Sequence, residues 1–136
     1  MRLLRLRIGA VAHFAVALGH FACLFFLKDA FNAYGILDEM TQLCFGHEWL
    51  LYAVTIFLSI AFAIAGLYAL SASGDIRRLP IQKLVITAII AVYSIRTVVG
   101  IYMLIGNFSL LEFFSTAVPA LLVWCYLPGL KISAKQ

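Results

Sequence analysis

The sequence predicts an all-α membrane protein, built as a bundle of four transmembrane helices. Of the 136 residues, 65% are hydrophobic and 12% are charged, and the mean hydropathy is +1.05. A soluble domain carries about 25% charged residues, so an ordinary soluble globule is excluded. The apolar residues form four runs, each close to the roughly 20 residues that a spanning helix needs. We expect a single membrane domain over residues 1–136, with spans at 8–27, 49–72, 81–106 and 110–127.

The first apolar run follows three arginines and has a superficial likeness to a secretory signal. It is about 20 residues long, contains His13 and His20, and ends at Phe25–Asp29 without a small-residue cleavage pattern. We therefore expect an uncleaved first span.

Residues 28–47 form a more polar connection. Apolar residues at 36, 37, 40, 43 and 44 recur at helical spacing, which predicts a short amphipathic helix on the outer surface. The alternative interpretation is a lid over the bundle.

The second span carries polar and small residues on one face, at steps of three and four: Glu48, Tyr52, Thr55, Ser59, Ala63 and Gly66. A turn at 73–80 follows, and we expect Pro80 in the first turn of the third helix, where a missing N–H is harmless.

The third and fourth spans repeat this pattern after a minimal turn at 106–109. The third places Tyr93, Arg96, Thr97 and Gly100 on one face, and the fourth places Glu112, Ser115, Thr116 and Pro119 on one face. Pro119 predicts a kink or a freed carbonyl near Ser115. We expect Pro128–Gly129 to end the last helix.

Basic residues predict the orientation. With four spans, eight basic residues fall on one side against Lys28 alone on the other: Arg2, Arg5, Arg7, Arg77, Arg78, Lys83, Lys131 and Lys135. The positive-inside rule then predicts that both termini are cytoplasmic. Because orientation explains the net charge of +4, we expect no nucleic-acid partner.

Arg96 is the one charge predicted far from water. It follows Pro80 by about 16 residues, or about 24 Å of helix, in a hydrocarbon layer about 30 Å thick. An arginine near mid-membrane costs about 3 kcal/mol or more. Arg96 must therefore find a carboxylate, a carbonyl or water inside the bundle.

Matching depths along antiparallel helices predicts a polar layer around Arg96. Its expected members, which we assign as candidate ligand-binding residues, are Arg96, Glu112, Glu48, His20, Tyr93, Thr97 and Thr55. One interpretation is a structural ion pair of Arg96 with Glu112 or Glu48, and the other is a binding cavity or a proton-handling site.

Catalytic, metal and cofactor signatures are absent from the sequence. His13 and His20 are seven residues apart on one helix, whereas membrane haems usually need histidines from opposing helices. The three cysteines form no CxxC pair. We therefore expect no metal, no cofactor and no catalytic residue.

Three segments of the central hairpin carry a resemblance: Gly66–Ser71, Gly74–Pro80 and Tyr93–Arg96. They resemble small four-span bacterial inner-membrane proteins of unassigned function, over about a third of the chain. The architecture also looks like that of DoxX-like proteins, without a shared residue motif. The resemblance implies a multi-pass protein of the bacterial inner membrane and implies no activity.

Three functions agree with these observations. The first is a bundle that binds, or helps to transport, a small polar or anionic ligand or a lipid. The second is a non-catalytic assembly subunit, as a homo-oligomer or in a larger membrane complex. The third is a membrane enzyme or redox protein that uses His20 and Glu112.

Overall fold

The chain folds into helices throughout the part that the structure describes, which is residues 1–33, 35–106 and 110–133 of a computed structural model. These residues contain no strand. The elements in chain order are α1 (Arg2–Cys23), η1 (Leu24–Phe26), α2 (Leu27–Ala33), α3 (Leu37–Leu43), α4 (Glu48–Ser73), α5 (Gln82–Gly106) and α6 (Leu110–Ser133).

Four helical segments are long and apolar enough to cross a membrane, within the described ranges: Arg2–Ala33, Glu48–Ser73, Gln82–Gly106 and Glu112–Lys131. The predicted all-α class and the four candidate spans are therefore confirmed, whereas insertion and the cytoplasmic termini stay predictions. Residues 107–109 of the predicted turn, and Lys135 of the basic tail, lie outside the described residues.

The chain divides into two compact units. Unit 1 comprises residues 1–12 and 65–136, and unit 2 comprises residues 13–64. Helices α1 and α4 each contribute to both units. The single membrane domain over the whole chain stays a prediction.

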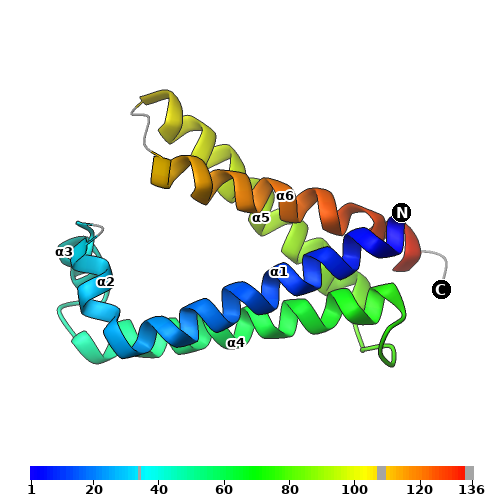
Figure 1. Ribbon diagram of the computed structural model, residues 1–136, viewed down its shortest axis with the longest axis horizontal. Helices are drawn as coiled ribbons and strands as arrows, with labels where there is room; N and C mark the ends of the chain where they lie inside the picture. Colours follow the sequence, from blue (N-terminus) through cyan, green and yellow to red (C-terminus); the bar gives the residue numbers. More distant parts are fainter. Residues whose placement is uncertain (34, 107–109, 134–136) are drawn as a thin grey trace. The chain divides into compact units, whose positions relative to one another are not determined.

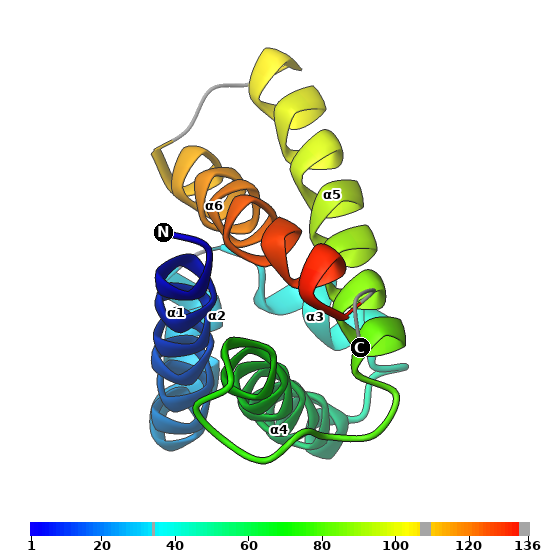
Figure 2. The same cartoon turned by 90° about the vertical axis from the view of Figure 1, so that its right-hand side faces the viewer.

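The hairpin of α5 and α6 dominates unit 1, with the two helices side by side in both views (Figures 1 and 2). The first turns of α1 pack on the end of α6 in this unit. A Cβ at Gly9 would lie only 2.9 Å from the Tyr126 ring, and one at Gly129 would lie 3.3 Å from Leu6. The Tyr126 hydroxyl donates to the Ala65 carbonyl at 3.0 Å, which ties α6 to the end of α4.

The last helix continues beyond its predicted end. We expected Pro128–Gly129 to stop it, but α6 runs on to Ser133. Gly129 packs tightly against Ile86 of α5 and Leu6 of α1, since a Cβ there would lie 3.1 Å from Ile86 and 3.3 Å from Leu6. Tertiary packing therefore holds the last turns helical despite two residues with poor helix propensity.

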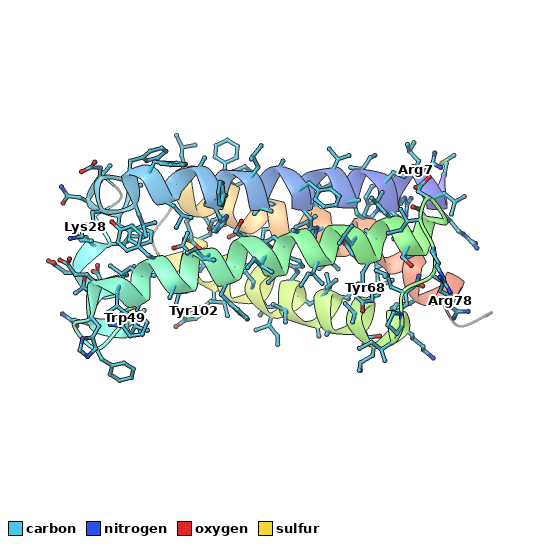
Figure 3. The ribbon with its side chains drawn as sticks, turned by 90° about the horizontal axis from the view of Figure 1, so that it is seen from below. Arg7, Lys28, Trp49, Tyr68, Arg78 and Tyr102 are labelled. Atoms are coloured by element: carbon cyan, nitrogen blue, oxygen red, sulfur yellow. The ribbon has the colours of Figure 1, made fainter. Side chains whose placement is uncertain are left out.

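The connection from α4 to α5 is held by an ion pair. Arg7 donates from Nε and Nη2 to the two Asp75 oxygens, at 2.9 and 2.5 Å, and the Ser73 hydroxyl also donates to Asp75. These bonds from Arg7, and next the one from Ser73, hold the pKa of Asp75 below its ordinary value. Arg7, Tyr68 and Arg78 lie around this connection in Figure 3.

Helix α5 begins later than expected. Ile81 has a positive φ of 49°, and the helix starts at Gln82. Pro80 therefore belongs to the turn and not to the first turn of the helix. The Pro80 carbonyl accepts a hydrogen bond from the Tyr68 hydroxyl at 3.1 Å, which fixes the turn against α4.

In unit 2, the second half of α1 packs beside the first half of α4. The Ser59 hydroxyl donates to the Ala17 carbonyl at 2.8 Å, on the face of α4 that the sequence predicts to be polar and small. The amphipathic connection contains the short helices α2 and α3, as Figure 1 shows. Buried Leu27, Cys44 and Leu51 join them to α4. The location of this connection on an outer surface stays a prediction.

Candidate functional site

Arg96 of α5 meets two side chains of α6. Its Nη2 donates to the Ser115 hydroxyl at 2.8 Å, and Nη1 and Nη2 each lie 3.4 Å from one oxygen of Glu112, Oε1. All three residues belong to unit 1. The predicted approach of Arg96 and Glu112 is therefore observed, whereas a ligand-binding role for them stays a prediction.

The first turns of α6 supply the acceptors because Glu112 and Ser115 are three residues apart and share a face. Glu112 stands in the first turn, where the positive end of the helix dipole stabilises a carboxylate. The Ser115 hydroxyl donates to the Glu112 carbonyl at 3.2 Å. The hydroxyl proton of Ser115 is thus used within α6, and a lone pair of the same oxygen accepts the hydrogen bond from Arg96.

A glycine lets the two helices approach at this point. Gly100 is buried on α5, and a Cβ there would lie 2.9 Å from both Cβ and Cγ2 of Thr116. The Thr116 hydroxyl donates to the Glu112 carbonyl at 2.8 Å. Close contact between small residues is what joins helices in lipid, where no hydrophobic force drives them together.

Pro119 adds a backbone acceptor near the guanidinium. It lies inside α6 and has no N–H, so the carbonyl of Ser115, four residues earlier, loses its usual helical partner. The helix is continuous through this position. The Ser115 carbonyl is therefore a backbone acceptor that lacks its usual helical donor, on the residue whose hydroxyl bonds Arg96.

Two predicted members, Tyr93 and Thr97, lie on α5 within one turn of Arg96. The Thr97 hydroxyl donates to the Tyr93 carbonyl at 2.7 Å, so its proton serves its own helix. Within the described part of α5, the hydrogen bond of Thr97 is to its own helix and not to the guanidinium. Thr97 is left with acceptor lone pairs only.

The remaining predicted members lie in unit 2, each with a local partner. Glu48 pairs with Lys28, with Nζ 2.5 Å from Oε2. His20 Nδ1 bonds to the Val16 carbonyl at 2.9 Å, and the Thr55 hydroxyl donates to the Leu51 carbonyl at 2.8 Å. The meeting of these three residues with Arg96 stays a prediction.

Two residues that bond to predicted members of the polar layer are not among the residues predicted from the sequence. Ser115 is the nearest partner of Arg96, and its spacing from Glu112 is the signal that could have found it. Lys28 is the partner of Glu48, and no periodicity links them, because the intervening residues fold into α2 and α3.

The site has one positive and one negative side chain, both half-buried. The Arg96 side chain is 39% exposed and that of Glu112 is 23% exposed. Over the described ranges, no three His, Cys, Asp or Glu side chains gather where they could hold a metal ion. No family model, curated protein or solved structure matches the chain.

Proposed function

We propose that this chain is a multi-pass protein of the bacterial inner membrane that binds a small anionic ligand, or the anionic group of a lipid, through Arg96. The four long apolar helices support the membrane setting. The placement of the basic residues supports cytoplasmic termini. Transport of the bound anion would extend this role.

The observation that carries the proposal is the incomplete pairing of Arg96. Its guanidinium makes one short bond, to Ser115, and reaches only one oxygen of Glu112, at 3.4 Å. A closed arginine–carboxylate pair uses two parallel bonds of about 2.7–2.9 Å. The same protein contains such a pair, because Arg7 grips both oxygens of Asp75 at 2.9 and 2.5 Å.

The unused donors define the ligand. A guanidinium has five N–H groups in a planar fork that matches a carboxylate or a phosphate. Among the described residues, the hydrogen bonds of Arg96 come from Nη1 and Nη2 and none comes from Nε, and Nη1 has only the long contact to Glu112. An anion with two oxygens would therefore find donors available, in a setting where low polarity strengthens the attraction.

Glu112 then acts as an internal competitor. Its carboxylate occupies part of the guanidinium and keeps the empty site neutral, so a charged arginine is not left alone in lipid. An arriving anion takes the place of Oε1, while Ser115 keeps its own bond to Nη2. This exchange predicts that removal of the Glu112 charge strengthens anion binding.

The test uses octyl phosphate, an amphiphilic phosphate monoester, titrated calorimetrically into the full-length protein in non-ionic detergent. We expect saturable binding to the wild type and its loss in Arg96→Ala. In Glu112→Gln the affinity should rise about tenfold, which corresponds to a charged hydrogen bond of about 1.5 kcal/mol. Arg78→Ala, which removes a cation from the turn, is the matched control and should leave the affinity unchanged.

Equal binding to wild type and Arg96→Ala would overturn the proposal. A Glu112→Gln affinity at or below that of the wild type would do the same, because Glu112 would then be a structural partner and not a competitor. Circular dichroism and gel filtration establish that each variant retains its helices.

A further inference from the structure

Unit 2 contains a cavity of about 260 Å³ that the Arg96 site does not use. It lies between the second half of α1, the helices α2 and α3, and the first half of α4, so every lining residue belongs to residues 13–64. We call it the α3 cavity. Its volume equals that of about nine water molecules, which suits one small ligand.

Most of the wall is apolar. Leu27 and Leu51, each 2% exposed, form the buried cluster with Cys44, and Phe31 and Met40 pack against that cluster. Helix α3 has only seven residues, too few to be stable alone, so these contacts hold it in place. A cavity with such a wall favours an apolar body.

Two polar side chains, His20 and Thr55, also line the α3 cavity. Each of them already donates a proton to a backbone carbonyl. Thr55, only 6% exposed, donates its hydroxyl proton to the Leu51 carbonyl. His20 Nδ1 faces the Val16 carbonyl at 2.9 Å, so in the neutral ring it carries the proton. Nε2 and the Thr55 oxygen are thus left as acceptors.

The ring of His20 is also held in position. Its centroid lies 5.0 Å from that of Phe62 on α4, at an angle of 58°. This packing and the bond to Val16 act on two sides of the imidazole. The acceptor nitrogen is therefore fixed before a ligand arrives, which lowers the entropic cost of binding.

We infer that the α3 cavity binds a small apolar molecule with one hydroxyl donor, of the phenol or alcohol class, whose single hydroxyl proton is donated to the Thr55 oxygen, with Nε2 of His20 as the second acceptor that lines the cavity. The described lining contains no Lys or Arg, so a carboxylate or phosphate would meet no countercharge. This ligand chemistry differs from that of the Arg96 site, and the inference does not depend on the proposed anion binding.

The cavity contains its own reporter, because Cys23 and Cys44 both line it. The variant Cys23→Ala/Cys125→Ala leaves Cys44 as the only thiol, and its reaction with N-ethylmaleimide can be timed by mass spectrometry. The probe is 4-propylphenol. Its methyl ether, 4-propylanisole, has the same apolar body without a donor. The variant Cys23→Ala/Cys44→Ala, which keeps Cys125 in unit 1, is the control for general effects on labelling.

We expect 4-propylphenol to slow the labelling of Cys44 and to leave that of Cys125 unchanged. Because the phenol can donate one hydrogen bond that the ether cannot, the phenol should bind about fivefold more tightly than the ether. Thr55→Val, which keeps the shape and removes the acceptor, should abolish this difference without preventing protection by the ether. Ala30→Leu, at another lining position, should fill the cavity and weaken protection by both.

The inference would be overturned if phenol and ether protected Cys44 equally, if neither protected it, or if Cys125 were protected to the same extent. Thr55→Val places no new bulk in the cavity, so the phenol-to-ether ratio remains informative even if His20 variants fold poorly.

Discussion

Replacement of Gly100 by alanine should separate α5 from α6 at the candidate site. The added Cβ would overlap the Thr116 hydroxyl oxygen and would lie 2.9 Å from Cβ and Cγ2 of the same residue. Because ordinary carbon contacts are about 3.5–4.0 Å, the helices must open by about 0.6 Å or more. Overpacking of this kind costs about 1–3 kcal/mol, and alanine returns about 1 kcal/mol through its helix propensity.

The same opening should weaken the polar contact of the site. A displacement of about 0.6 Å along the bond would lengthen the Arg96–Ser115 distance from 2.8 Å to about 3.4 Å, outside the usual range for an N–H···O bond. We therefore expect Gly100→Ala both to reduce the free energy of unfolding and to lengthen the hydrogen bond between Arg96 and Ser115.

A double-mutant cycle isolates the steric cost. Thr116→Gly removes the atoms that clash, so Gly100→Ala should be tolerated in that background, with a coupling energy of about 1–3 kcal/mol. Unfolding by SDS titration, followed by circular dichroism, gives the four free energies. Gly19→Ala, where nothing lies within 4 Å of the added Cβ, is the matched control. A coupling energy below about 0.5 kcal/mol would refute the close approach of the two helices.

Three further predictions concern other contacts. The pKa of Asp75 should lie below its ordinary value of 3.8 and should rise in Arg7→Gln, as carbon NMR titration can measure. Because folding lowers this pKa, the Arg7–Asp75 contact persists at neutral pH and is lost as the pH falls through the lowered value. Trp124→Leu removes the ring that lies 3.9 Å from the Arg5 guanidinium and should cost about 0.5–1 kcal/mol in SDS unfolding, with Trp124→Phe losing less. Ser59→Ala deletes an interhelical bond and should cost about 0.6 kcal/mol in the same assay.

The length and hydropathy of the apolar runs were enough to predict the long helices. A spanning helix must satisfy its backbone internally, so length and hydropathy suffice to locate it, and the four segments agree with the structure. Depth matching also brought Arg96 and Glu112 together. The sequence places a turn at 106–109 between the two spans, so the distance of each residue from that turn along the chain predicts its level.

Helix ends and local pairings depend on contacts that one sequence does not reveal. The predicted end of α6 at Pro128–Gly129 is wrong because Gly129 packs against Ile86, and this tertiary contact outweighs helix propensity. The partner of Glu48 was not identified because Lys28 reaches it across two short helices. Depth matching offered Arg96 as a partner of Glu48, and the structure shows Lys28 as a partner within the same unit.

Under the proposed function, stability and binding would draw on the same few residues in the α5–α6 hairpin. Lipid supplies no hydrophobic drive between helices, so close packing and polar contacts must hold them, and here both occur within one turn of Gly100 and Arg96. A fully closed pair at Arg96 would stabilise the hairpin more, but would leave no donor for an anion. The long contact to Glu112 is therefore the compromise that the proposed function predicts, because one arginine would both join two helices and remain open to a ligand.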